Sequence, residues 1–67
     1  LDNSLEKDAA LSFYLKAVAG ARQNKADVLT NNLKAAIQKD ASFKAMAKDD
    51  AEFIKFRENA DFKALIN

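Results

Sequence analysis

The chain has 67 residues, with no cysteine, histidine or proline and one glycine, and 11 basic residues against 10 acidic ones give a net charge of +1. These absences exclude a disulfide framework, thiolate or imidazole metal sites, a histidine-based triad and a glycine-rich phosphate loop. The balanced charge does not favour nucleic acid as a partner, and no apolar run approaches the roughly 20 residues that span a bilayer. We therefore expect one small domain without a catalytic, cofactor or metal site and without a membrane span.

The composition predicts an all-α fold. Alanine, leucine, lysine and glutamate, which are strong helix formers, are common, and no stretch alternates apolar and polar residues as a strand does. The first helix is expected from about Asp8, whose carboxylate would cap it, to Gln23. Residues 1–7 are expected to be a tail or the end of a preceding helix.

Two apolar stripes run along the first helix, so we expect another part of the structure to pack on each of two sides of it. One stripe comprises Leu11, Leu15 and Val18, and the other comprises Phe13, Ala17, Gly20 and Ala21. A glycine inside a helix costs about 0.5–1 kcal/mol relative to alanine, so Gly20 indicates a close approach by a second helix.

The second helix is expected over residues 26–39, after a turn at 23–25 in which Asn24 takes the left-handed conformation. Its core stripe is spaced at helical intervals and comprises Leu29, Leu33, Ala36 and Ile37. A short turn between two amphipathic helices predicts an antiparallel helical hairpin over residues 8–40.

A short repeat fills residues 41–67 and predicts two or three short capping helices. Residues 40–46, 50–56 and 59–65 each open with Asp or Asn, place Phe three positions later and add another apolar residue three positions after that. The opening residue of each unit is a good N-cap. Helices of two turns are unstable alone, so these phenylalanines are expected to dock on the hairpin as core.

Residues 13–40, FYLKAVAGARQNKADVLTNNLKAAIQKD, resemble one tetratricopeptide (TPR) repeat, and YLKAVAGAR is similar to repeats of Bacteroidetes-type bacterial TPR proteins. The tail DAEFIKFRENADFKALI is similar to the ends of TPR arrays. The sequence departs from the family pattern at four positions: Lys16, Gly20, Leu29 and Ala41. The resemblance implies the C-terminal repeat and cap of a larger protein, because one repeat alone cannot bury both faces.

In the TPR family the first helix of a repeat lines a concave surface that binds extended peptides. The resemblance implies that five residues of this chain contact a protein or peptide partner: Leu11, Tyr14, Val18, Ala21 and Arg22. The Lys and Asn that clamp a peptide carboxylate in some members are replaced here by Tyr14 and Val18, which argues against a carboxylate-clamp adaptor.

We therefore expect a non-catalytic interaction or scaffolding module whose partner is another protein, a peptide or preceding repeats of the same chain. Two alternatives stay open, a helical accessory domain of a longer enzyme and a self-associating domain that forms a homodimer. The acidic pair Asp49 and Asp50 has no nucleophile or acid–base partner, and N-capping accounts for Asp50. A chain without cysteine is compatible with both the cytoplasm and the bacterial periplasm, so the sequence leaves the location open.

Overall fold

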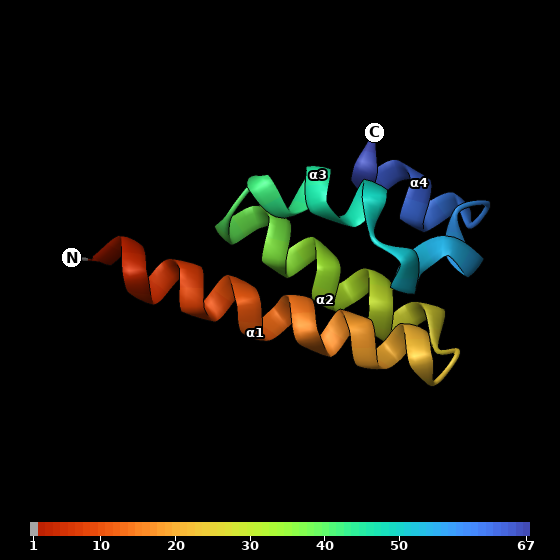
Figure 1. Cartoon of the computed structure of the whole chain (residues 1–67), viewed down its shortest axis with the longest axis horizontal. Helices are drawn as coiled ribbons and strands as arrows, with labels where there is room; N and C mark the ends of the chain where they lie inside the picture. Colours follow the sequence, from red (N-terminus) through yellow and green to blue (C-terminus); the bar gives the residue numbers. More distant parts are fainter. Residues whose placement is uncertain (1) are drawn as a thin grey trace.

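The computed structural model describes residues 2–67, with side chains described from Asp8 onward. All regular structure in this part of the chain is helical: α1 (Asp2–Arg22), α2 (Ala26–Lys39), α3 (Ser42–Asp49), the 3-10 helix η1 (Ala51–Phe56) and α4 (Ala60–Ile66). Helices α1 and α2 lie side by side and run in opposite directions (Figure 1). Helices α3 and α4 pack on α2, while η1 reaches α1. The all-α prediction is therefore confirmed.

The first helix begins earlier than the sequence reasoning predicted. Because α1 starts at Asp2, Asp8 is an exposed residue inside the helix rather than its N-cap, and residues 2–7 belong to α1. Leu1 lies outside the described residues. Residues 5–7 are Leu, Glu and Lys, which favour continuation of the helix toward the N-terminus. With 21 residues against the 14 of α2, α1 is about 10 Å longer, and its N-terminal end extends beyond α2 (Figure 1).

The turn between α1 and α2 follows the predicted chemistry. Asn24 has a φ of 60°, which is the left-handed conformation that ends many helices. The N–H of Lys25 donates to the carbonyl of Gly20 at 2.8 Å, and the N–H of Asn24 donates to that of Ala21 at 3.1 Å. This pair of bonds is a Schellman motif, and it reverses the chain so that α2 returns along α1.

Helices α1 and α2 approach each other closely through small residues. A Cβ atom placed on Gly20 would lie 2.8 Å from the backbone nitrogen of Leu29 and 2.9 Å from a methyl carbon of Val28. The contact explains the glycine inside α1, as the sequence indicated. The buried face of α1 recurs at helical spacing and consists of Ala10, Tyr14, Ala17 and Ala21, opposite Leu29, Leu33 and Ala36 of α2.

Side chains cap the short C-terminal helices. The Asp50 carboxylate accepts from the amide two residues later at 2.9 Å, and the Asn59 side chain accepts from the amide three residues later at 3.0 Å. The Asp40 carboxylate accepts from the amide of Ser42 at 3.1 Å and from its hydroxyl at 2.7 Å, although the helix boundary falls one residue later, at Ala41. The predicted N-caps are therefore confirmed for η1 at Asp50 and for α4 at Asn59, whereas Asp40 lies one residue before the N-cap of α3.

Phenylalanine rings anchor these helices, as predicted. The buried set comprises Phe43, Phe53, Phe56 and Phe62. The second apolar residue of the first unit, Met46, is exposed instead, and Ala47 takes the buried position. The middle unit adopts 3-10 rather than α geometry over six residues. Runs of this kind longer than 3–4 residues are uncommon, so η1 is the least regular part of the fold.

Candidate interaction surface

Tyr14 lies in the core rather than on an open face of α1, and only 4% of it is exposed. Its ring stacks on Phe43, with centroids 5.0 Å apart and planes at 30°, and meets the edge of Phe53 at 5.6 Å. Its hydroxyl donates to the Asp50 carboxylate. Burial, followed by this hydrogen bond, raises the pKa of the Tyr14 phenol well above its ordinary value. The open contact surface predicted at Tyr14 is not present, because α3 and η1 of the same chain cover it.

Arg22 also binds the chain's own η1. Its Nε and one terminal nitrogen donate to the two carboxylate oxygens of Glu52, at 3.1 and 2.7 Å. The hydrogen bonds from Arg22 hold the pKa of the Glu52 carboxyl below its usual range. Both side chains remain substantially exposed, so this two-pronged pair orients η1 more than it stabilises the fold.

One acidic residue, Asp50, both caps η1 and attaches it to Tyr14 of α1. One of its carboxylate oxygens accepts from the amide of Glu52, and the other accepts from the Tyr14 hydroxyl. The sequence reasoning assigned Asp50 to capping alone and missed the second contact, which joins residues 36 positions apart. A carboxylate has two acceptor oxygens, but no local pattern indicates which distant donor the second one meets.

The remaining predicted contact residues divide between core and surface. Ala21 is buried, so it does not lie on an open face of α1 either. Val18 is partly buried and packs against the core, whereas Leu11 is 46% exposed. Leu15, which was expected in a core stripe with Leu11 and Val18, is 57% exposed. From the sequence we expected a neighbour on both apolar stripes of α1, but only the stripe with Ala17 and Ala21 is buried, whereas Leu11 and Leu15 of the other stripe are exposed.

Leu11 and Leu15 form the exposed apolar pair of α1. They lie four residues apart and so are neighbours on the helix surface. Two other large apolar residues are exposed among the described residues, Met46 on α3 and Ile54 on η1. The Leu11–Leu15 pair lies near the middle of α1, the longest helix.

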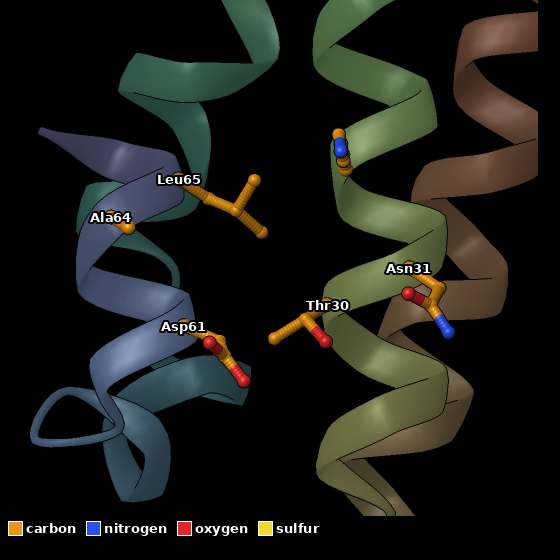
Figure 2. Close-up of a pocket in the computed structure, with 6 residues that line it drawn as sticks. Thr30, Asn31, Asp61, Ala64 and Leu65 are labelled. Atoms are coloured by element: carbon orange, nitrogen blue, oxygen red, sulfur yellow. The ribbon is translucent and has the colours of Figure 1, made fainter.

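A pocket of about 390 Å³ lies between α2 and α4. Thr30 and Leu65 point into it, whereas Asn31 points away from α4 (Figure 2). The Thr30 hydroxyl donates to the carbonyl of Ala26 at 3.0 Å, so this residue offers its methyl group to the pocket. The charged groups of the lining are Lys34 and Asp61. Such a lining has few convergent polar groups and does not define a ligand.

In the part of the chain that the structure describes, no group of three or more acidic residues is arranged to hold a metal ion. None of the described helices combines the length and apolar character needed to cross a membrane.

Neither a protein-family model, nor a curated protein, nor a solved structure matches this sequence. The TPR resemblance therefore stays a prediction, and the case for function depends on the surface described above.

Proposed function

We propose that this chain is a non-catalytic protein-interaction or scaffolding module, a TPR-like repeat followed by its C-terminal cap. The observation that carries the proposal is the exposed pair Leu11 and Leu15 on α1. Full burial of a leucine side chain stabilises a protein by about 1.5–3 kcal/mol, so a small domain with two exposed leucines forgoes a large part of its possible stability. A helical partner that covers the pair recovers that free energy.

The TPR-like part of the proposal is supported by the arrangement of α1 and α2. The two helices are antiparallel and joined by a three-residue turn, and small residues of α1 face leucines of α2. In an array of repeats, the side of α1 that carries Leu11 and Leu15 would pack against the preceding repeat. The partner surface we propose is therefore narrower than the resemblance implied: it retains Leu11, adds Leu15 and excludes Tyr14 and Ala21.

The test is a comparison of captured proteins between paired variants. The double variant Leu11→Lys/Leu15→Lys removes the apolar pair while keeping residues that form helices well. Met46→Lys is the matched control, because it replaces another exposed apolar residue outside α1. The proposal predicts that the wild type and the control retain a protein that the double variant loses. The purified partner must then bind the wild type and the control more tightly than the double variant. Equal retention by all three contradicts it.

Self-association through the same leucines is a second candidate. An uncharged pair on one helix is self-complementary about a twofold axis, as a homodimer interface requires. Light scattering distinguishes this candidate, since the mass would rise with concentration for the wild type and stay monomeric for the double variant.

A further inference from the structure

The C-terminal segment is held on α1 by contacts that are specific to its side chains. Asp50 accepts a hydrogen bond from the Tyr14 hydroxyl, and Glu52 accepts two from the guanidinium of Arg22. The Phe53 ring packs on the Tyr14 ring. Within residues 51–67, Glu52 and the adjacent Phe53 therefore form the pattern that α1 recognises. A second copy of this chain carries the same pattern and offers the surface of α1 the same groups.

The connection between α3 and η1 has the form of a hinge. A single residue, Asp50, separates the two helices, with φ −78° and ψ 122°. A long 3-10 segment often marks a hinge or strain, and η1 has six residues in that geometry. The chain has no proline, and its one glycine is Gly20, so residues 42–56 contain no helix breaker. If Asp50 becomes helical, α3 and η1 join into one continuous α-helix.

A ring contact joins η1 to α4: the Phe53 ring lies 5.6 Å from the Phe62 ring, at 54°. Straightening at Asp50 would carry η1 and α4 away from the helices on which they now pack, which are α1 for η1 and both α2 and α3 for α4. The exposed surface is then complementary to the same segment of another molecule, which is the usual route to an exchanged dimer.

We propose that the surface of α1 around Tyr14 and Arg22 is an interaction site for residues 51–67 of a second copy of this chain, exchanged through a hinge at Asp50. The proposal concerns the covered part of α1 and is independent of the exposed leucine pair. In the exchanged dimer the contacts of η1 and α4 with α1 and α2 form between molecules. The gain is a helix that continues from α3 through Asp50, and the cost is both the cap at Asp50 and its hydrogen bond from Tyr14.

Two proline variants test the hinge directly. Ala51→Pro places proline at the first position of η1, where a fixed φ is tolerated, and keeps Asp50 in the extended conformation that it already has. The same substitution blocks a continuous helix from α3 to η1. Ala60→Pro is the matched control, because Asn59 before it is also extended, with φ −70° and ψ 127°, and Ala60 is the first residue of α4.

The measurement is light scattering after refolding from denaturant over about a hundredfold range of concentration, where mass action favours dimers at the high end. We expect a dimer for the wild type and for Ala60→Pro. For Ala51→Pro we expect the association constant of the dimer to fall by about a hundredfold or more, because proline inside the continuous helix destabilises it by that factor. Circular dichroism checks that each variant retains its helices.

Three results would overturn the proposal. The first is a wild type that stays monomeric after refolding at the highest concentration. The second is an equal dimer fraction for Ala51→Pro and the wild type. The third is a loss confined to Ala60→Pro, which would place the hinge at Asn59. The two proposals fail in different experiments. If the proposed function is wrong, Leu11→Lys/Leu15→Lys leaves partner capture unchanged. If the exchange is wrong, Ala51→Pro leaves the dimer fraction unchanged.

Charge reversal supplies a second test that does not depend on proline. Arg22→Glu and Glu52→Arg each place like charges across α1 and η1 within one molecule, whereas an exchanged dimer of the two variants restores opposite charges at both contacts. We expect mixed dimers to exceed the statistical half of all dimers when the variants are refolded together, and to return to it at high salt. Mixed dimers at or below the statistical half in low salt would contradict exchange.

Discussion

The substitution Gly20→Ala tests the close approach of α1 and α2. By intrinsic preference alone, alanine inside a helix is more stable than glycine by about 0.8–1 kcal/mol. The structure reverses this expectation, because the new Cβ would lie 2.8 Å from the backbone nitrogen of Leu29. An ordinary contact begins at 3.4 Å, so the two helices must separate by about 0.6 Å at their crossing, where packed interiors yield little.

The expected magnitude follows from these opposing effects. Overfilling of a packed interface costs about 1–3 kcal/mol, and a backbone atom cannot rotate away as a side chain can. After subtraction of the helix preference, we expect Gly20→Ala to lower the free energy of unfolding by about 1 kcal/mol. Since a domain of 67 residues has a total stability of only about 3–10 kcal/mol, the change is readily measured.

The assay is urea unfolding followed by circular dichroism, with a common slope for all variants. For a slope near 1 kcal/mol/M, the midpoint of Gly20→Ala should fall by about 1 M. Ala19→Gly is the control, because Ala19 is the exposed neighbour and should lose about 0.5–1 kcal/mol from helix preference alone. A higher midpoint for Gly20→Ala than for the wild type would refute the close contact.

Three further predictions concern the docking of η1. Phe53→Ala should lower the free energy of unfolding by about 3–5 kcal/mol in urea titrations, because the ring is fully buried; a loss below about 1 kcal/mol would place it on the surface. Folding raises the pKa of Tyr14, so the protonated phenol contributes fully to the free energy of unfolding below its unfolded pKa of about 10, and this contribution is lost as the pH rises through the folded pKa. Tyr14→Phe should therefore lose less stability in alkali than the wild type. An identical loss would contradict the hydrogen bond to Asp50. Because the pKa of Glu52 is lowered by Arg22, stability should fall as the pH drops below about 4.3, and Glu52→Gln should flatten this dependence in acid titrations; an unchanged profile would show that the pair is not formed.

Features fixed by local chemistry were predictable from the sequence. The span of α2, the left-handed Asn24 and the caps at Asp50 and Asn59 depend on residues within a few positions of each other. The buried phenylalanines were predictable for the same reason, since each follows its cap at a fixed interval. The start of α1 was not, because Asp8 is a suitable cap that the preceding helix formers make unnecessary.

The exposure of the leucine stripe of α1 was not predictable, because it depends on contacts between distant segments. The leucine stripe is the more apolar one, yet the crossing with α2 requires small residues, so Ala17 and Ala21 are buried and Leu11 and Leu15 are exposed. The burial of Tyr14 depends on α3 and η1, which are far along the chain. Apolar periodicity identifies candidate faces, and only tertiary packing selects between them.

Helix α1 has one face covered by its own chain and one face left open. Solvent paramagnetic relaxation of leucine methyl groups, measured by NMR on the dilute monomer, tests this division in one spectrum. We expect strong broadening for Leu11 and Leu15 and protection for the fully buried Leu29 and Leu33. Protection of all four side chains would contradict it, because no open apolar face would remain on α1 for a partner.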